Sequence, residues 1–493
     1  MIGGDAIGGV PHFADRPLAA AGCGSSQTPS TSQSPKTSLT SCTVNGLSAK
    51  CGTVQVPEDW AQPTGPTIPI EVVVLPATAT SNPGTPLFIL SGAGGHAYGL
   101  GDSVLNGMPW AAQAFHRLNQ TSDLVFVEQR GTPGSDLETC PGLENWFASP
   151  ATIQAAARRC LALAALDPRH YTTTSAVRDL DQVRQSLGYS KINIYGVSYG
   201  VTMGLAYLQL YSSHVRTAVL DSGSLLNVPE EQLGSIHTQH AFDLLASRCA
   251  ATPSCARSYH PAADLATILA RLRAHPVKIT LPGSGGQHQT IAITATGFTG
   301  FLDENLSSIE TAVVLPAVLH ALVLGQWSQV LSKLGITTAS PNNGPISLQD
   351  VTIRCSDAWA IMNPATVSQQ GPSVFASEVT LKAAGFHALC AVWPHDPGVS
   401  GTVHSTVPIV FLNGTADSGD PPSSVAGATA TMPNALLVSV PGIGHWTLGW
   451  NPHPTCLLDA TTAFIQAGKP ASPATWAACT RALASQPVPF ATP

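Results

Sequence analysis

The segment KINIYGVSYG at residues 191–200 constrains the fold of this chain more than any other stretch of its sequence. An alternating apolar run leads to Ser198, which lies between Gly196 and Gly200, and a second apolar stretch follows directly. This pattern is typical of a sharp strand-to-helix turn that exposes a strained serine above the edge of a sheet. The backbone passes so close to itself at such a turn that only glycine fits at the two flanking positions. The alternative is an ordinary turn, because Gly-x-Ser-x-Gly is short enough to occur by chance.

Short apolar runs that end in turn residues recur along the chain and read as strands. They lie at residues 67–77, 86–92, 123–131, 191–196, 217–223, 407–417 and 435–445. Residues 174–188 have the pattern of an amphipathic helix, with Thr174 or Ser175 as its N-cap and Gly188 beyond its end. Its apolar face would consist of Val177, Leu180, Val183 and Leu187. Strands and helices in this order predict an α/β fold with a mostly parallel sheet, and Ser198 lies where sites in such sheets form.

The pattern becomes mainly helical at about residue 226 and returns to strands after residue 400. We therefore predict a core in two parts, 42–225 and 401–493, with a cap inserted between them at 226–400. A hairpin is predicted within the cap at 277–294, with Gly283, Gly285 and Gly286 as turn residues. The most apolar window, 311–325, is too short to span a bilayer and is interpreted as a buried helix. Residues 1–41 are predicted to be a disordered export or tether segment.

The two late strands supply what a serine nucleophile needs. Asp417 follows the first of them and His445 the second, each in a loop that contains glycine. A serine hydroxyl is a poor nucleophile until a base accepts its proton, and that base needs a carboxylate to fix its tautomer. The chain order Ser198, Asp417, His445 is the order of α/β-hydrolases. Asp420 is the alternative to Asp417, because turn boundaries predicted from sequence are uncertain by a few residues.

Serine chemistry also needs hydrogen-bond donors for the oxyanion that develops during acyl transfer, each worth roughly 3–4 kcal/mol. The backbone N–H of Tyr199, directly after the candidate nucleophile, is one such donor. The glycine-rich stretch LSGAGGHAYG at 90–99 follows an apolar strand and could present the second. A plain flexible loop is the alternative reading of that stretch.

Composition excludes several functional classes. Only 10% of the 493 residues are charged, 44% are hydrophobic, and the net charge is −7, so no basic face for nucleic acid is expected. The sequence contains no convincing dinucleotide fingerprint or metal-binding cluster, so neither a cofactor nor a metal is predicted. The nearest approach to a zinc pattern is HALC at 387–390.

Eleven cysteines indicate an oxidising compartment, because most of them fall into close sequential pairs. The predicted disulfides join Cys42 with Cys51, Cys140 with Cys160, Cys249 with Cys255, Cys355 with Cys390, and Cys456 with Cys479. Cys23 remains, after small residues and before a Ser/Thr/Pro/Gln tract, as at a bacterial lipoprotein cleavage site. Residues 1–17 argue against that reading, because they lack a clean apolar region after a basic start. We expect a secreted or cell-envelope protein, with a lipid anchor at Cys23 as one option.

A series of motifs resembles the secreted bacterial α/β-hydrolase serine peptidases of the proline iminopeptidase and tripeptidyl aminopeptidase group. These motifs are LSGAGG, VEQRGTPGS, DLDQVRQSLGYSKINIYGVSYG, NGTADSGDP and GIGHW, and the segments CAATPSC, IRCSDAW and CAVWP resemble the tripeptidyl aminopeptidase branch. The resemblance covers most of residues 42–480. It implies that Ser198 is the nucleophile, Asp417 the orienting acid and His445 the base. It also implies that Gly92 or Ala93 shares the oxyanion hole with Tyr199.

The chain departs from this family at two motifs. Residues 91–94 are Ser-Gly-Ala-Gly where the family usually has Gly-Gly-Pro-Gly, which could loosen the oxyanion loop. Glu128 stands where the family usually has aspartate, and its longer side chain could shift Arg130. In the simplest structural interpretation, Arg130 only ties a strand to a loop through a salt bridge.

An aminopeptidase must also hold the α-ammonium group of its substrate, most simply with a carboxylate that faces the cleft. Candidates in the cap stretch GFLDENLSSIE are Asp303, Glu304 and Glu310, and Asp357 in CSDAW is a further one. Carboxylates on exposed helices are commonly just solvated, which is the alternative for each of them.

Three functional classes are consistent with these residues. The first is a serine exopeptidase that removes residues or short peptides from free N-termini through an acyl-enzyme, acting as a monomer. The second is an esterase or amidase for small acyl substrates with the same triad. The third is a catalytically silent binding module, which an intact triad disfavours.

Overall fold

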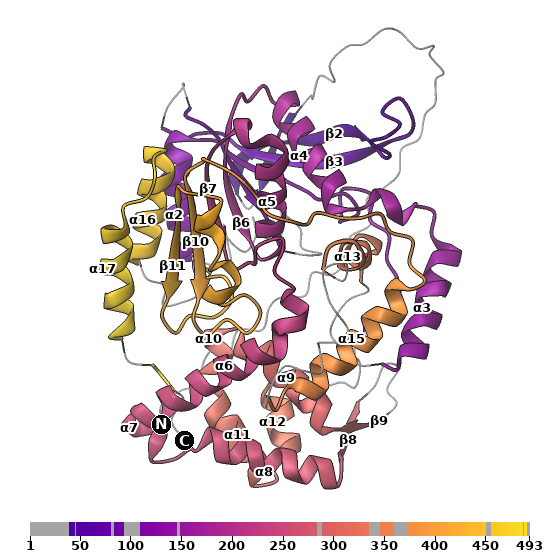
Figure 1. The fold of residues 1–493 in the computed structure, drawn as a ribbon, viewed down its shortest axis with the longest axis vertical. Coiled ribbons are helices and arrows are strands. Elements are labelled where there is room, and N and C mark those ends of the chain that lie inside the picture. The colour runs from indigo at the N-terminus through magenta and orange to yellow at the C-terminus, as the bar shows by residue number, and fades with distance from the viewer. Residues whose placement is uncertain are drawn as a thin grey trace.

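A twisted sheet forms the centre of the molecule (Figure 1). The computed structural model describes residues 39–44, 46–79, 83–92, 109–144, 148–282, 288–334, 346–358, 373–449, 455–486 and 488–490. Within these residues the sheet has nine strands in the order β1-β2-β3-β5-β4-β6-β7-β10-β11. The strands are β1 (Thr40–Val44), β2 (Leu47–Pro57), β3 (Thr67–Leu75), β5 (Leu124–Val127), β4 (Leu87–Leu90), β6 (Ile192–Val197), β7 (Val215–Asp221), β10 (Ile409–Gly414) and β11 (Ala435–Val440).

The strands from β5 to β11 in this order pair in parallel, and those from β1 to β5 pair antiparallel. All residues of β4, β5, β6 and β10 are buried, as expected for parallel strands that helices cover on both faces. The mostly parallel sheet confirms the fold class predicted from the sequence. The β1–β2 hairpin at the antiparallel edge was not predicted.

Helices cover both faces of the sheet. One face packs against α4 (Thr173–Ser186) and α5 (Tyr199–Tyr211), and the other against α2 (Pro109–Thr121), α16 (Thr455–Ala467) and α17 (Pro473–Ala484). Successive side chains of β6 point to opposite faces of the sheet, so Ile194 packs in the first layer and Tyr195 in the second. Thr172 caps α4 by accepting a hydrogen bond from the Ser175 amide, so the predicted cap at Thr174 or Ser175 was wrong.

The chain between β7 and β10 is mainly helical and forms the lower part of Figure 1. It contains α6 (Glu230–Ala251), α7 (Pro253–Ala256), α8 (Pro261–Ala274), β8 (Val277–Pro282), β9 (His288–Ile293), α9 (Ala295–Leu306), α10 (Ile309–Ala312), α11 (Leu315–Val323), α12 (Trp327–Lys333), α13 (Leu348–Ile353), the π-helical turn η5 (Arg354–Ala358) and α15 (Ala376–Cys390). Strands β8 and β9 pair antiparallel as the predicted hairpin, and its glycines lie outside the described residues. We call residues 226–400 the cap segment.

The cap segment has a hydrophobic core of its own, to which α6, α8, α9 and α11 contribute. The apolar window at 311–325 was predicted to be one buried helix, and this was wrong. It contains the end of α10, a turn and α11. Pro316 lies in the first turn of α11, where proline is tolerated because its missing N–H would have no partner there. Leu315, Leu319 and Leu322 are buried, whereas the neighbouring Leu324 is 62% exposed.

The five predicted disulfides are all present, joining Cys42–Cys51, Cys140–Cys160, Cys249–Cys255, Cys355–Cys390 and Cys456–Cys479. Cys23 lies outside the described residues. Among the helices that the structure describes, none has the length and apolar composition needed to cross a bilayer.

Arg130 is fully buried after β5 and joins three separate parts of the chain. Its guanidinium pairs with Asp179 of α4 and donates hydrogen bonds to the carbonyl oxygens of Glu58 and His170. Glu128 does not take part in these contacts, and its Oε2 accepts a hydrogen bond from Thr132. Breaking such a buried pair by removing one partner typically lowers the free energy of unfolding by about 3–5 kcal/mol. A structural role in tying these parts of the chain together therefore accounts for Arg130.

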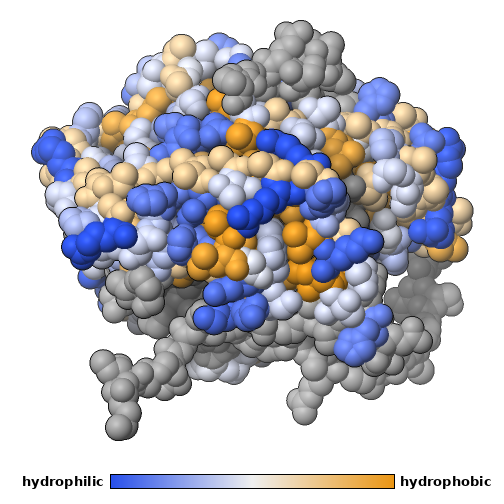
Figure 2. Space-filling view, turned by 90° about the horizontal axis from the view of Figure 1, so that it is seen from below, coloured by the Kyte–Doolittle hydropathy of each residue, from blue (hydrophilic) through white to orange (hydrophobic). Residues whose placement is uncertain are grey.

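The surface at the end formed by the cap segment mixes polar and apolar residues. Figure 2 shows that its apolar side chains stand in small groups separated by hydrophilic ones. Among the described residues on this face, no broad apolar patch of the kind that marks a large protein interface is visible.

The glycines that flank Ser198 give the first testable prediction. A Cβ on Gly200 would lie 2.2 Å from the carbonyl oxygen of Leu90, and backbone cannot yield as a flexible side chain can. We expect Gly200→Ala to lower the free energy of unfolding by about 1–3 kcal/mol and to reduce Tm accordingly. Gly427→Ala is the matched control, because its Cβ would find its nearest neighbour at 3.9 Å. Equal Tm values for the two variants in thermal unfolding would contradict the close approach.

Candidate active site

Ser198 occupies a strained turn between β6 and α5. Its φ of 57° and ψ of −125° lie in a region that non-glycine residues rarely adopt. A Cβ on Gly196 would lie 2.3 Å from the carbonyl oxygen of Gly200, so neither glycine tolerates a side chain. The Ser198 amide donates to the carbonyl oxygen of Asp221 at 3.0 Å, which fixes the turn to the neighbouring strand β7. This is the sharp turn that the Gly-x-Ser-x-Gly pattern predicts.

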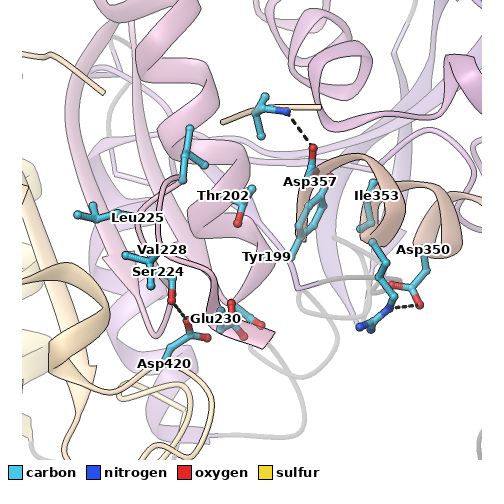
Figure 3. A pocket seen from close by; sticks show the side chains of 15 residues that line it. Tyr199, Thr202, Ser224, Leu225, Val228, Glu230, Asp350, Ile353, Asp357 and Asp420 are labelled. Atoms are coloured by element: carbon cyan, nitrogen blue, oxygen red, sulfur yellow. Dashed lines mark hydrogen bonds and ion pairs between the residues drawn. The ribbon is translucent and has the colours of Figure 1, made fainter. Parts of the chain in front are cut away.

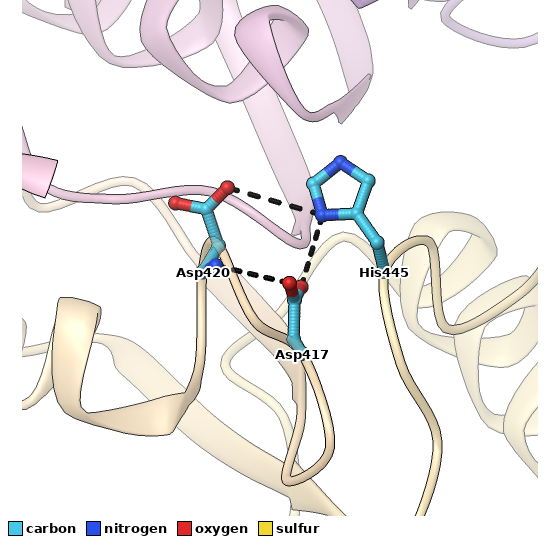
Figure 4. A group of neighbouring side chains, drawn as sticks. All are labelled: Asp417, Asp420 and His445. Atoms are coloured by element: carbon cyan, nitrogen blue, oxygen red, sulfur yellow. Dashed lines mark hydrogen bonds and ion pairs between the residues drawn. The ribbon is translucent and has the colours of Figure 1, made fainter. Parts of the chain in front are cut away.

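Asp417 and His445 lie side by side in the loops after β10 and β11 (Figure 4). His445 Nδ1 lies 3.0 Å from Asp417 Oδ2. The other oxygen of Asp417 accepts hydrogen bonds from the amides of Gly419 at 2.9 Å and Asp420 at 3.0 Å. These contacts hold a fully buried carboxylate in one orientation against the imidazole ring.

Asp420, the alternative to Asp417, contacts His445 less closely. Its Oδ2 lies 3.9 Å from His445 Nδ1, and its Oδ1 accepts a hydrogen bond from Ser224 at 2.6 Å. Burial, with the charges of Glu230 and Asp417, raises the pKa of Asp420 well above its usual range. Burial also opposes the charge of Asp417, but His445 and the two amide hydrogen bonds hold the pKa of that carboxyl below its usual value. Asp417 is therefore the ionised partner of the ring.

The pKa of His445 is raised to about 10. Burial of the ring opposes its charged form, but the hydrogen bond and charge of Asp417, with the charges of Asp420 and Glu230, outweigh that effect. The ring is thus surrounded by carboxylates that favour imidazolium, the species that forms when a histidine accepts a proton from serine.

The loop of His445 is attached to the strand end beside Ser198. The amide of Trp446 donates to Ser222 Oγ at 2.8 Å, and the amide of Thr447 donates to Asp221 Oδ1 at 2.8 Å. Asp221 is the partner of Val197 in the parallel pairing of β7 with β6, and Val197 directly precedes Ser198. The sheet therefore brings the predicted serine, acid and base to one edge.

Gly92 lies against Ser198. A Cβ on Gly92 would be 3.5 Å from Ser198 Cβ and 3.7 Å from its Oγ. Tyr199 is the first residue of α5, where the amides of a helix have no partner within the helix. Ala93 lies outside the described residues.

A cavity of about 210 Å³ opens beside Ser198 (Figure 3). Its lining mixes apolar residues with acidic ones and one arginine. The lining residues are Ser198, Tyr199, Thr202, Gly223, Ser224, Leu225, Leu226, Val228, Glu230, Asp350, Ile353, Arg354, Asp357, Val399 and Asp420. Figure 3 shows Glu230 beside Asp420 on one side, with Asp350 and Asp357 on the other. Burial raises the pKa of Asp420 well above its usual range and that of Asp357 to about 7. Asp350 pairs with Arg354, so Glu230 is the carboxylate that gives this cavity its acidic character.

Of the three predicted ammonium ligands whose side chains the structure describes, only Asp357 lines the cavity. Asp303 accepts a hydrogen bond from Thr238 at 2.6 Å within the cap segment, and Glu304 is exposed. The side chain of Glu310 lies outside what the structure describes.

Three charged residues of the cavity, Glu230, Asp350 and Arg354, were missed in the sequence analysis. Glu230 opens α6 directly after Pro229, which reads as an ordinary acidic helix start. Its position just after β7, near the strand ends, was the signal that could have identified it.

One group of side chains in the described part of the chain could hold a metal ion. Ligand atoms of Asp417, Asp420 and His445 lie within 4.8 Å of one another. Asp417 Oδ1 already accepts two amide hydrogen bonds, and its Oδ2 lies at hydrogen-bond distance from the imidazole. A cation would have to replace these contacts, so the residues fit an acid-base pair better than a metal centre.

Comparison with protein families agrees with this fold. The α/β hydrolase fold family matches residues 86–280, and the TAP-like protein family matches residues 378–479. The chain is a TAP-like α/β-hydrolase. The first match includes β4 to β7 with Ser198, and the second includes β10 and β11 with Asp417 and His445.

Named relatives of this TAP-like hydrolase include peptidases and an esterase. It is 30% identical over 192 residues to tripeptidyl aminopeptidase of Streptomyces lividans, covering 35% of each chain. It is 27% identical over 241 residues to serine protease Hip1 of Mycobacterium tuberculosis, covering 43% of this chain and 44% of Hip1. It is 32% identical over 279 residues to carboxylesterase B of Mycobacterium tuberculosis, covering 50% of this chain and 52% of the esterase. The matched parts thus span about a third to a half of these relatives.

The raised pKa of His445 predicts the pH dependence of activity. Only the neutral ring can accept a proton, so kcat/KM on an uncharged ester should rise with pH toward the ring pKa of about 10. Glu230→Gln removes a negative charge that favours imidazolium, so the rising limb should move to lower pH. The exposed Glu304→Gln serves as control and should leave the limb in place. An unshifted limb in Glu230→Gln, measured by initial rates across the pH range, would contradict this charge coupling.

Proposed function

We propose that the protein is a serine hydrolase in which Ser198 is the nucleophile, His445 the general base and Asp417 the residue that orients the base. The observation that carries this proposal is that one edge of the sheet holds the strained Ser198 turn and the 3.0 Å pair of His445 and Asp417. In this mechanism His445 removes the proton of Ser198 as its Oγ attacks the acyl carbon. The amides of Tyr199 and the Gly92 loop stabilise the oxyanion. His445 then gives its proton to the leaving amine or alcohol as the bond of that group to the acyl carbon breaks, and water hydrolyses the acyl-enzyme.

We further infer that the substrate is a peptide with a free N-terminus, from which a residue or short peptide is released. The acidic cavity beside Ser198 supports this reading, because a carboxylate in the substrate cavity can hold an α-ammonium group. The relatives named tripeptidyl aminopeptidase and serine protease support a peptide substrate. The number of residues released is not part of the proposal.

Glu230 is the carboxylate that we propose as the ammonium ligand. Glu230 lies at the side of the cavity next to Asp420, and its charge acts on His445 (Figure 3).

An esterase is the second candidate, with the same nucleophile and base. The apolar residues Leu225, Leu226, Val228 and Ile353 of the cavity and the relative named carboxylesterase B favour it. For either activity we propose a secreted or cell-envelope location, supported by the five disulfides.

Acetylating the substrate N-terminus separates the two candidates. The change removes the positive charge and leaves the anchoring carboxylate without a partner, which should cost about 2–5 kcal/mol in a partly buried site. We therefore expect at least a tenfold lower kcat/KM for acetylated than for free-amine fluorogenic peptides. Glu230→Gln should cause a similar loss on free amines while sparing an uncharged ester at high pH, and Glu304→Gln should change neither. Equal cleavage of both peptides would move the esterase or an endopeptidase ahead.

A further inference from the structure

One short segment of the cap contacts both proposed halves of the oxyanion hole. Residues 348–357 comprise α13 and most of η5, and they contribute Asp350, Ile353, Arg354 and Asp357 to the cavity wall. All of α13 is buried, and the disulfide Cys355–Cys390 fastens η5 to the end of α15. A π-helical turn of this kind is rare and often lies at a functional site. We call residues 348–357 the wall segment.

The first contact runs to the Gly92 loop through two buried amides. Gln349 Nε2 of the wall segment donates to Gln129 Oε1 at 3.0 Å. Gln129 Nε2 lies 3.3 Å from Ser91 Oγ and 3.4 Å from the carbonyl oxygens of Ser91 and Gly92. Gln349 is 1% exposed and Gln129 3% exposed, so water does not compete for these groups. Ser91 and Gly92 are therefore held by Gln129, which is held in turn by Gln349 of the wall segment.

The second contact runs to Tyr199 through a buried hydroxyl. Thr173 Oγ1 donates to Asp357 Oδ2 of the wall segment and also lies at hydrogen-bond distance from the Tyr199 hydroxyl. Because Thr173 has one proton, Tyr199 is the donor in the second bond. The amide of Val399 donates to the other oxygen of Asp357 at 2.9 Å. Tyr199, whose backbone N–H is a proposed oxyanion donor, is thereby fixed through its side chain to the cavity wall.

We propose that Gln349 and Asp357 are positioning residues that set the geometry of the oxyanion hole, Gln349 through Gln129 on the Gly92 loop and Asp357 through Thr173 on Tyr199. The inference rests on the proposed function, because it assumes that these two elements supply the oxyanion donors. It adds that a single cap segment aligns donors from two distant parts of the core. Oxyanion donors act only when held at the place where charge develops, so misalignment lowers kcat more than it weakens substrate binding.

The test uses variants that remove one hydrogen bond with little change of volume. Gln349→Met removes the hydrogen bond to Gln129, and Tyr199→Phe removes the hydrogen bond to Thr173. On a short uncharged ester, each should lower kcat at least tenfold while KM stays within about twofold of the wild-type value. Each should also weaken inhibition by a trifluoromethyl ketone of the same acyl group by the factor lost in kcat/KM, because its adduct carries the oxyanion.

Two comparisons separate this role from a folding effect. Ser356→Ala changes a buried side chain of the same wall segment, whose hydroxyl makes no hydrogen bond within the described residues, and should leave both constants unchanged. Asp357→Asn keeps an oxygen that can accept and should retain most of kcat, whereas Asp357→Leu should behave like Tyr199→Phe.

Wild-type kcat in Gln349→Met and Tyr199→Phe would overturn the positioning role while leaving the proposed function intact. A loss of kcat without weaker ketone inhibition would overturn it as well, since that pattern reports a general structural defect. Retained activity in Ser198→Ala would instead overturn the proposed function, and the positioning role with it.

Discussion

The close approach of three backbone segments around Ser198 is the constraint on which the rest of the site depends. Gly196, Gly200 and the end of β4 at Leu90 meet so closely that any side chain at either glycine would overlap a carbonyl oxygen. This contact holds α5 against the ends of β4 and β6, with Ser198 at a positive φ and the Gly92 loop beside it. Because β7, β10 and β11 continue the same parallel ladder, the loops with Asp417 and His445 reach the same edge. Backbone geometry therefore places the proposed nucleophile, acid and base at one edge of the sheet, and side-chain contacts only refine their positions.

Residues of the cap segment line the cavity and contact the loops of Asp417 and His445. The His445 amide donates to the carbonyl oxygen of Ser307 at 2.7 Å, and a Cβ on Gly444 would lie 2.0 Å from that oxygen. His237 of α6 lies 2.9 Å from the carbonyl oxygen of Gly419, next to the Asp417 turn. On our account the wall segment adds control of the oxyanion hole. The loops that carry Asp417 and His445 thus contact cap residues that help to fix their conformation.

The sequence was most informative where chemistry and backbone geometry coincide in a few adjacent residues. The Ser198 turn, the strands that lead to it and the five cysteine pairs are local patterns, and the structure has them. The ammonium ligands were less predictable, because a carboxylate on a cap helix can face the cavity, the cap core or solvent. Asp303 binds Thr238, and Glu304 is exposed, whereas Glu230 reaches the cavity from a helix start. The contacts of Gln349 and Asp357 join residues more than 180 positions apart, so no local pattern could reveal them.

The most direct test of the account is to identify the residue that a serine-directed fluorophosphonate modifies in the intact protein. Peptide mapping by mass spectrometry should find the adduct on Ser198 alone, with labelling abolished in Ser198→Ala and strongly slowed in His445→Ala, because the base activates the nucleophile. The variants should keep the wild-type Tm within a few degrees. An adduct on another serine, or labelling of Ser198 that is as fast without His445 as with it, would contradict the proposed chemistry.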